Sequence, residues 1–389
     1  MRFLINCSNL KAGGGLQVAD SLCCQFGKYP QHSFIVVLSP YMIGTEVRMK
    51  NLPNVETVTY EVPNSFKSIV LGRDVFLDSL VEEKSVLAVL TVFGPSRWCP
   101  RVPHLSGFAM PHLVIPESPF FTQMHIIERV KWLFWCLFRK WSFKKSASFF
   151  WTENPLISTR LESILGVRSN CRKKACSRKS FSNQKQVFTV SNYYNQVFDD
   201  PQLWRNHPLE PFDGITCLSV SAYYPHKNFP ILVEAANILQ REYPNFHFRF
   251  VLTFDKGLMS VPNELRKHFV FIGRVDVSEC PDLYRHSDVM VMPTLLECFS
   301  ATYPEAMRME VPIVTTDLEF ARGLCGDAAC YYNAVDAKAC ADAIYKVATD
   351  KDYAQLLVEN GKRQLMKYDN YEQRAEKLVK ILEEIALVD

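Results

Sequence analysis

The sequence predicts an α/β protein with two doubly wound, Rossmann-like domains, and three observations support this prediction. Short apolar runs alternate with helical patterns in both halves of the chain, which is typical of parallel sheets with helices on both faces. The chain has 389 residues, more than a single hydrophobic core usually serves. Apolar residues make up 48% of it and charged residues 22%, as in an ordinary globular protein.

The first half supplies one series of strands. RFLINC (2–7) is read as a buried strand, the loop SNLKAGGG follows it, and a helical pattern begins at Leu16. Apolar runs at 34–39 and 86–94 add further strands, and the segment 103–116 adds one more strand, followed by a proline-bounded loop. We expect this domain to cover residues 1–200.

The second half repeats the alternation. Strands are predicted at 215–222, 246–254, 269–273, 288–293 and 311–317, with a helix from Phe229 to Arg241 after the first of them. The polar, proline-containing stretch 190–212 separates the halves, so we place the second domain at residues 201–370. The remaining residues, 371–389, predict a helix over Glu372–Ile385 that packs near the domain junction.

Composition and charge restrict the class of protein. A formal net charge of +3 is too small to favour nucleic acid as a partner. No stretch approaches the ~20 apolar residues needed to cross a bilayer, and the first residues lack the apolar region of a secretory signal. The 13 cysteines show no zinc-ligand spacing, so we expect free thiols in a reducing cytoplasm.

Charged residues follow two predicted strands of the second half. Lys227 comes after strand 215–222, and Glu297 follows strand 288–293, eight residues before Glu305. Ligands bind at the carboxyl ends of the strands in doubly wound folds. Carboxylates accept hydrogen bonds from sugar hydroxyls, and an ammonium group neutralises phosphate. Together these three side chains suit a nucleotide sugar.

Two of these residues also have ordinary structural explanations. Lys227 can be a surface lysine, with Asn228 as the N-cap of the helix that follows. Thr302 and Glu305 have the spacing of a capping box, in which Glu305 only caps its own helix.

The loop Gly13-Gly14-Gly15 follows the first strand and opens a helix. Glycines there allow close approach to a ligand, and helix N–H groups favour an anion. A dinucleotide fingerprint would have a third glycine where this chain has Val18. The loop is therefore either a ligand contact or a tight strand-to-helix turn.

The segment 215–350 resembles the GT-B glycosyltransferases, in particular the retaining group known as family 4. The residues that carry the resemblance are Lys227-Asn228 after SVSA, FIGRV (271–275), LYRHSDVMVMPTLLECFSATYPEAMRMEVPIVTTD and GDAACYYNAVD (326–336). Glu297 to Glu305 is similar to the family's Glu-x7-Glu motif. The first half fits through its glycine loop and strand order. The resemblance implies a GT-B fold, whose two Rossmann-like domains face each other across a cleft.

The resemblance also implies a role for each matched residue. Lys227 would hold the donor diphosphate and stabilise the leaving nucleotide, Glu297 would bind sugar hydroxyls, and Glu305 would bind the ribose. The other donor-binding positions that it implies are Phe299, Ser300 and Ala301 through backbone N–H groups, Gly273 and Arg274 near the base, and Gly13, Gly14 and Gly15 near the phosphates or the acceptor.

A histidine of the first domain commonly lies near the transferred sugar in this family. His112 is the candidate here, with His104 as the alternative, so the predicted catalytic residues are Lys227, Glu297 and His112. The chain departs from the family at Ala222, where an arginine is frequent, and it has Ser300 where a glycine is frequent. Without that arginine, leaving-group stabilisation would depend more on Lys227 and on helix N-termini.

The resemblance implies chemistry without a metal or another cofactor, because cationic and dipolar groups act at the diphosphate. The sequence contains one Asp-x-Asp pattern, at Asp350 and Asp352, in a polar connecting segment near the C-terminus. We expect no metal site there.

Residues 126–145 combine aromatic and basic side chains. A helix over them would place on one face Ile127, Val130, Phe134, Leu137, Phe138 and Trp141. Its longest uncharged run, 132–138, is too short to cross a bilayer. The many cations favour an interfacial helix on anionic lipid over a core helix with solvated lysines. The basic stretch 168–179 would add to that surface or form a loop.

Together with these residues, the resemblance implies a retaining, metal-independent glycosyltransferase of polysaccharide biosynthesis. It would move a sugar from a nucleotide-diphosphate sugar to a glycan or lipid-linked acceptor, in the cytoplasm and in peripheral contact with the inner face of the cytoplasmic membrane. The alternatives are a sugar-nucleotide 2-epimerase of the same architecture and a non-catalytic nucleotide-sugar-binding partner. A dinucleotide oxidoreductase is disfavoured by the incomplete glycine fingerprint.

Overall fold

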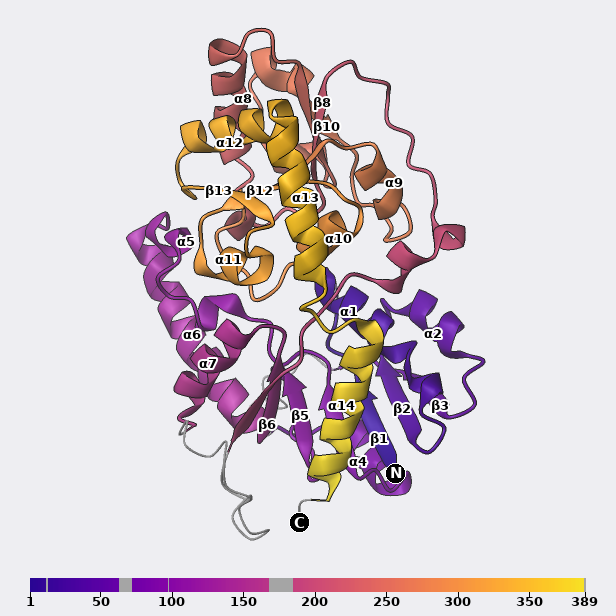
Figure 1. Ribbon diagram of the computed structural model, residues 1–389. Coiled ribbons are helices and arrows are strands. Elements are labelled where there is room, and N and C mark those ends of the chain that lie inside the picture. Colours follow the sequence, from indigo (N-terminus) through magenta and orange to yellow (C-terminus); the bar gives the residue numbers. More distant parts are fainter. Residues whose placement is uncertain (12, 63–71, 97, 168–184, 388–389) are drawn as a thin grey trace. The chain divides into compact units, whose positions relative to one another are not determined.

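The computed structural model describes residues 1–11, 13–62, 72–96, 98–167 and 185–387 (Figure 1). The chain divides into two compact units. Unit 1 contains residues 1–116, 125–192 and 369–389, and unit 2 contains residues 117–124 and 193–368. The basic stretch 168–179 lies outside the described residues.

Unit 1 is built on a seven-stranded parallel sheet in the order β3-β2-β1-β4-β5-β6-β7. Its strands are β1 (Arg2–Asn6), β2 (Ser33–Leu38), β3 (Val55–Thr59), β4 (Ala88–Thr91), β5 (His104–Gly107), β6 (Phe149–Thr152) and β7 (Gln186–Thr189). Its α-helices are α1 (Gly14–Cys23), α2 (Ile43–Met49), α4 (Val75–Glu83), α6 (Ile126–Ser146), α7 (Pro155–Leu165) and α14 (Tyr371–Ala386).

Both faces of this sheet are covered, as continuous apolar strands require. Successive side chains of a strand point to opposite faces, so Phe3 and Ile5 join a core with α1 and α14, while Leu4 joins another with Leu77 of α4. Ile5 lies between Val36 of β2 and Leu90 of β4 in the register of the sheet.

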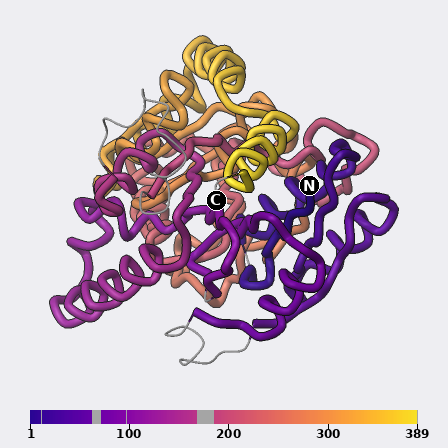
Figure 2. The backbone as a smooth tube through the Cα atoms, turned by 90° about the horizontal axis from the view of Figure 1, so that it is seen from below, coloured from indigo at the N-terminus to yellow at the C-terminus, as the bar shows by residue number. Residues whose placement is uncertain are grey.

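The C-terminal helix α14 is part of unit 1. Its apolar face is buried as the sequence predicts, and Figure 2 shows this yellow helix beside the indigo start of the chain. A capping box of Asn370 and Gln373 begins the helix. Arg374 is buried and donates hydrogen bonds to Asn192 and, at 2.9 Å, to Ser21 of α1. These bonds join the last helix to α1 and to the end of the segment 125–192.

Unit 2 is built on a six-stranded parallel sheet in the order β10-β9-β8-β11-β12-β13. Its strands are β8 (Ile215–Ser219), β9 (Phe248–Leu252), β10 (Phe269–Phe271), β11 (Val289–Met292), β12 (Ile313–Thr316) and β13 (Ala329–Tyr332). Its α-helices are α5 (Pro119–Thr122), α8 (Ile231–Glu242), α9 (Cys280–Arg285), α10 (Thr302–Arg308), α11 (Glu319–Cys325), α12 (Ala337–Thr349) and α13 (Lys351–Leu365).

Both sheets have a doubly wound strand order, in which the chain moves to one edge, returns to the middle and continues to the other edge. In unit 2, Cys217 and Phe250 face a core with α8 and α12, while Leu218 and Val251 face a core with α9 and α10. The predicted α/β class with two doubly wound domains is confirmed.

The structure differs from the sequence prediction in its details. Strands β3, β6, β7 and β13 lie outside the predicted strands. Two of them, β3 and β7, are partly polar and so lack a continuous apolar run. Along the chain, the boundary between the units lies between residues 192 and 193, before the predicted boundary at 200. The segment 117–124, placed in the first domain by sequence, folds with unit 2.

Candidate functional site

The strand order of unit 2 reverses between β8 and β11, which are hydrogen-bonded neighbours. In doubly wound sheets the ligand binds at this switch point, outside the carboxyl ends of the strands. The loop after β8 carries Lys227, and the loop after β11 carries Glu297. Residues 70 positions apart in the sequence are thereby brought to one place.

Lys227 and Glu297 form an ion pair at this switch point, with Nζ of Lys227 donating to Oε1 of Glu297. Their side chains are only 12% and 11% exposed. Lys227 ends the short 3-10 turn η7 (Pro225–Lys227), and Asn228 follows in the left-handed region at φ 54°. Asn228 is therefore not the N-cap of α8, which begins at Ile231; its amide donates to the Ala334 carbonyl instead.

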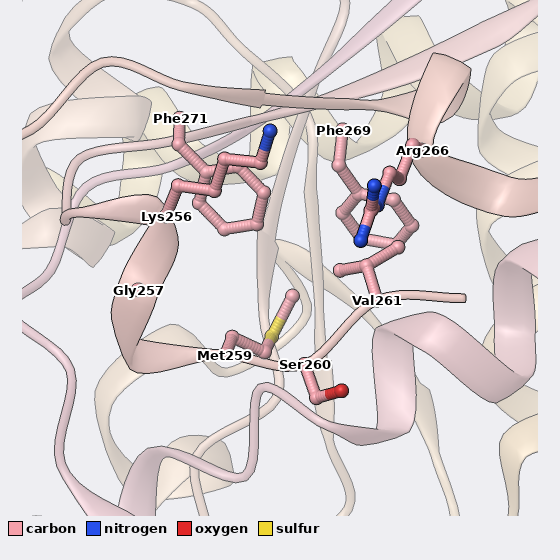
Figure 3. Close-up of a pocket in the computed structure, with 8 residues that line it drawn as sticks. All are labelled: Lys256, Gly257, Met259, Ser260, Val261, Arg266, Phe269 and Phe271. Atoms are coloured by element: carbon pink, nitrogen blue, oxygen red, sulfur yellow. The ribbon is translucent and has the colours of Figure 1, made fainter. Parts of the chain in front are cut away.

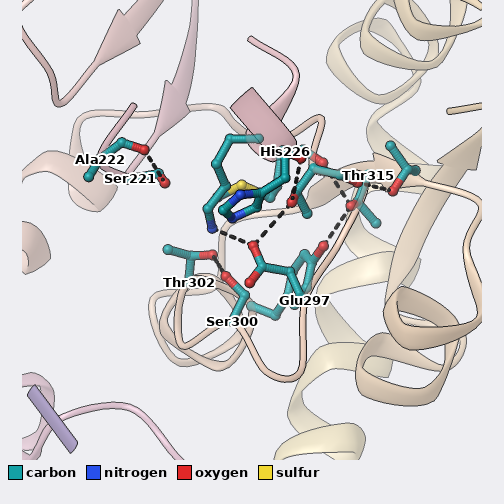
Figure 4. A network of polar contacts seen from close by, with 12 residues as sticks. Ser221, Ala222, His226, Glu297, Ser300, Thr302 and Thr315 are labelled. Carbon is teal, nitrogen blue, oxygen red and sulfur yellow. Dashed lines mark hydrogen bonds and ion pairs between the residues drawn. The ribbon is translucent and has the colours of Figure 1, made fainter. Parts of the chain in front are cut away.

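Several short bonds hold the loop that bears Glu297 (Figure 4). Thr294 Oγ1 donates to Glu297 Oε1 at 3.1 Å, and Thr316 Oγ1 donates to the Thr294 carbonyl at 2.7 Å. The Leu295 N–H donates to the His226 carbonyl at 2.8 Å, which ties the loop after β11 to the loop after β8. Glu297 is thus held by its surroundings before any ligand arrives.

Glu305 lies in α10 and is buried, with 8% of its surface exposed. Helix α10 begins at Thr302 with Ala301 as its N-cap, so the capping-box explanation is wrong. Glu305 Oε2 instead accepts a hydrogen bond from the Tyr284 hydroxyl at 3.1 Å. Burial raises the pKa of the Glu305 carboxyl to about 7, against the smaller lowering effect of that hydrogen bond.

The start of α10 carries the backbone groups predicted to face the donor. The first helical bonds are donated by Tyr303 N to the Ser300 carbonyl at 3.3 Å and by Glu305 N to the Ala301 carbonyl at 3.0 Å. The N–H groups of Phe299, Ser300 and Ala301 precede these bonds, at the positive end of the turn. The hydroxyls of Ser300 and Thr302 lie 2.9 Å apart.

The remaining predicted positions of unit 2 are more exposed. Gly273 follows β10 with φ +72°, where a side chain would be strained and would also lie 3.2 Å from Asp255. Arg274 is exposed, and so is Ala222, at the position where the family often has arginine. The Ala222 carbonyl accepts a hydrogen bond from the Ser221 hydroxyl at 3.0 Å (Figure 4).

The predicted residues of the first half lie in unit 1. Gly13, with φ +73°, is the N-cap of α1, which begins at Gly14. His112 lies in the 3-10 turn η2 (Pro111–Leu113), with its ring 5.2 Å from that of Trp132 and 4.6 Å from that of Trp135. Its catalytic role stays a prediction.

His104, the alternative histidine, is a core residue of β5. Its ring is hydrogen-bonded to Thr91 at 2.8 Å and to the Ser146 carbonyl at 2.7 Å. Burial lowers its pKa to about 4, so the ring is neutral at physiological pH. His104 therefore holds strands and helix together in unit 1.

Figure 3 shows a hollow beside β10 that contains none of the predicted site residues. Its volume is about 560 Å³, and it is lined by Lys256, Gly257, Met259, Ser260, Val261, Arg266, Phe269 and Phe271.

Metal ligands do not gather within the part of the chain that the structure describes: no group of three His, Cys, Asp or Glu side chains could hold an ion there. Asp350 is the N-cap of α13, with its carboxylate accepting from the Tyr353 N–H at 2.9 Å. The cysteines of the described residues form no disulfide.

Sequence reasoning missed Thr294, which donates to Glu297, and Tyr284, which donates to Glu305. It also missed that the segment 117–124 contacts the loop after β11, where the Ser118 hydroxyl donates to the Leu295 carbonyl at 2.6 Å. Thr294 could have been noticed, because it stands three residues before Glu297 in the same loop. Tyr284 and the segment 117–124 are distant in sequence from the residues they contact, and no local pattern marks them.

Comparison with known proteins defines the class. Residues 214–350 match the family model described as "Glycosyl transferases group 1". A glycosyltransferase from Rickettsia africae ESF-5 has a similar structure, with 14% identity, a TM-score of 0.69, and coverage of 100% of this chain and 99% of that one. Anabaena Alr3699/HepE in complex with UDP and glucose has 15% identity, a TM-score of 0.65 and coverage of 99% and 100%.

WaaG, a glycosyltransferase involved in lipopolysaccharide biosynthesis, has 12% identity, a TM-score of 0.65 and coverage of 98% of this chain and 99% of that one. No curated protein sequence matches the chain. The shared architecture defines a GT-B fold. The chain therefore has the GT-B fold, and its residues 214–350 are similar to the glycosyl transferases group 1 family.

Proposed function

We propose that this glycosyltransferase moves a sugar from a nucleotide-diphosphate sugar to a glycan or lipid-linked acceptor, with retention at the anomeric carbon and without a metal. The observation that supports this most is the Lys227–Glu297 pair at the β8/β11 switch point, with buried Glu305 on the helix that follows. The solved structures of Alr3699/HepE with UDP and with UDP-glucose make uridine diphosphate sugars the first donors to test.

Each group has a defined task in this proposal. The Lys227 ammonium neutralises the diphosphate as the bond to the sugar breaks, which is where charge develops. Glu297 accepts hydrogen bonds from sugar hydroxyls, and Glu305 accepts them from the ribose. Retention requires the acceptor to attack on the face from which the nucleotide leaves. His112 is proposed to lie near the transferred sugar.

Donor binding is tested by thermal unfolding in the presence of nucleotide sugars. A donor at 100 times its dissociation constant is expected to add about 2.7 kcal/mol to the free energy of unfolding and so to raise Tm. The variant Glu297→Gln keeps an oxygen for Lys227 and Thr294 but loses the charge. Its donor affinity is expected to fall about 10- to 100-fold, since hydrogen bonds to charged groups contribute about 1.5–3 kcal/mol.

The matched control is Glu359→Gln, which removes an exposed carboxylate paired with Lys362 at 3.2 Å in the same unit. Its donor affinity is expected to equal that of the wild type. A screen in which no nucleotide sugar raises Tm would count against the proposal. Conversion of the donor without any acceptor would instead indicate the epimerase.

The proposal includes peripheral contact with an anionic membrane through α6. The helix has 21 residues, of which only Phe143 and Ser146 are buried. Its exposed large apolar side chains are Ile126, Ile127, Val130, Leu133, Phe134, Leu137, Phe138 and Trp141. Their spacing of three and four residues makes one continuous apolar stripe along the helix. No helix among the described residues is long and apolar enough to cross a membrane.

Cations accompany this stripe and supply the charge that anionic lipid would attract. Arg139 lies over the Trp135 ring at 4.9 Å, and Lys145 lies over the Trp141 ring at 5.3 Å. Long basic side chains can lie along an apolar surface with their charges at its border. An apolar stripe with basic borders is the arrangement of a helix that lies in the lipid interface.

Vesicle flotation tests this contact. Wild-type protein is expected to float with vesicles of phosphatidylcholine and phosphatidylglycerol and to float less with phosphatidylcholine alone. Neutralising Arg139, Lys140, Lys144 and Lys145 with glutamine is expected to abolish the difference, because about 1 kcal/mol per cation is lost.

The control neutralises four exposed cations outside α6, Lys351, Arg363, Lys367 and Lys380, and is expected to float like the wild type. A second variant, Phe134→Ser with Leu137→Ser, is expected to reduce flotation with both vesicle types. Equal flotation of wild type and the α6 variants would refute the membrane contact.

A further inference from the structure

The segment 117–124 belongs to the first half of the sequence but folds as part of unit 2. It contains the short helix α5 and two phenylalanines, Phe120 and Phe121, of which only 8% and 9% is exposed. Both aromatic rings are therefore largely removed from water, which favours one position of the segment. The chain leaves unit 1 after residue 116 and returns to it at residue 125.

Ser118 binds this segment to the loop after β11. The residue is 3% exposed, and its hydroxyl donates to the Leu295 carbonyl at 2.6 Å and accepts from the Phe120 N–H at 3.2 Å. Leu295 itself is fully buried. Removing the hydroxyl would therefore deprive a buried carbonyl of this partner.

Phe120 binds the segment to the loop after β8. Its ring meets the His226 ring edge-on, with centroids 6.1 Å apart and an interplanar angle of 87°. His226 directly precedes Lys227, and its carbonyl accepts from the Leu295 N–H at 2.8 Å. The segment 117–124 thus contacts one residue in each of the two loops that carry Lys227 and Glu297.

We infer that Ser118 and Phe120 are positioning residues, which hold the loops after β8 and β11 so that Lys227 and Glu297 meet the donor in the correct geometry. This inference rests on the proposed function, because that function assigns the donor to Lys227 and Glu297. Neither Ser118 nor Phe120 need touch the donor. A small displacement of a group that stabilises developing charge lowers the rate of the chemical step more than it weakens binding of the ground state.

The kinetic test uses the full-length protein, its donor and its acceptor. Ser118→Ala is expected to lower kcat about tenfold and to change the donor KM less than threefold. Ser118→Thr restores a hydroxyl at the same place and is expected to recover most of kcat. The control is Ser287→Ala, because Ser287 also donates to a backbone carbonyl of unit 2, that of Leu283, at 2.6 Å. It is expected to leave kcat unchanged.

Phe120→Leu is a second variant, which removes the ring against His226 while keeping an apolar side chain. It is expected to lower kcat in the same way, with a similar donor KM. Wild-type kcat in both folded variants overturns the inference and leaves the proposed function intact.

Hydrogen exchange supplies a readout that does not need activity. In Ser118→Ala, the amides of Leu295 and Lys227, which donate to the His226 and Tyr224 carbonyls, are expected to exchange faster than in wild type. If the wild type transfers no sugar, the proposed function fails. The positioning role of Ser118 is then tested by the hydrogen-exchange rates of these two amides alone. Faster exchange supports that role, and unchanged exchange of both amides overturns it.

Discussion

Replacing Lys227 by alanine is expected to lower the rate of sugar transfer by about 10²- to 10³-fold, the usual cost of losing one preorganised group that stabilises transition-state charge. The chain has Ala222 where the proteins that it resembles often have a second cation, so the loss should fall at the upper end of that range. Steady-state kinetics with a saturating acceptor measure the effect. The control is Lys256→Ala, an exposed lysine of the same unit, which is expected to transfer at the wild-type rate.

The same substitution also affects folding, and a second variant separates the two effects. Without Lys227, the buried Glu297 carboxylate loses its cation, which typically costs about 3–5 kcal/mol of stability. The double variant Lys227→Met with Glu297→Gln removes both charges, and its stability is expected to recover while its activity stays low. Transfer by Lys227→Ala at a rate within threefold of the wild type would contradict the role of this lysine.

The second large effect is a pH dependence of stability caused by Glu305. Its pKa is about 7 in the folded protein, against an ordinary value of 4.5, because burial disfavours the charged form. Between these values the unfolded chain has released the proton that the folded chain still holds. The contribution of Glu305 to the free energy of unfolding is therefore fully present below pH 4.5 and is lost as pH rises to about 7, by a total on the order of 3 kcal/mol.

Glu305→Gln tests this dependence, since glutamine still accepts from Tyr284 and carries no charge at any pH. Urea unfolding at pH 5, 6, 7 and 8 is expected to show the variant close to wild type at pH 5 and more stable at pH 8. Glu359→Gln, an exposed change in α13, is the control and should follow the wild type. Parallel curves for wild type and Glu305→Gln would contradict the raised pKa.

Donor binding should show the opposite trend if Glu305 accepts the ribose hydroxyls. An ionised carboxylate is the better acceptor, so the donor affinity of the wild type is expected to rise between pH 6 and pH 8. The affinity of Glu305→Gln is expected to stay level. Calorimetric titration with the donor found by thermal unfolding measures both.

The sequence was informative where the physics is local. Continuous apolar runs predict buried parallel strands, so the alternation alone indicated two doubly wound sheets. The pattern of residues 372–385 predicts a helix with one apolar face, and α14 has that face. The helix at 126–145 was predicted with its apolar face, but the choice between core and surface could not be made from periodicity. The structure shows that the face is exposed.

Local patterns gave the wrong hydrogen-bond partner where a residue distant in sequence binds the same side chain. Thr302 and Glu305 have capping-box spacing, yet the helix starts at Thr302 itself. The Glu305 carboxylate instead accepts a hydrogen bond from Tyr284, 21 residues earlier in the sequence. Asn228 has a favoured N-cap side chain, but its left-handed backbone ends η7, and its amide binds Ala334 across the unit. Each short motif allows two outcomes, and tertiary packing selects one.

By itself, the sequence determined the fold class, most of the strands and the three charged residues that we propose for the donor site. Those follow from hydrophobic periodicity and from side-chain chemistry, which act over a few neighbouring residues. Only the tertiary structure decided that Lys227 and Glu297 meet as an ion pair, that Glu305 is buried against Tyr284, and that the segment 117–124 belongs to unit 2. These contacts join segments from about 20 to more than 170 residues apart. Which of them form depends on the packing of the whole unit, because no local propensity encodes them.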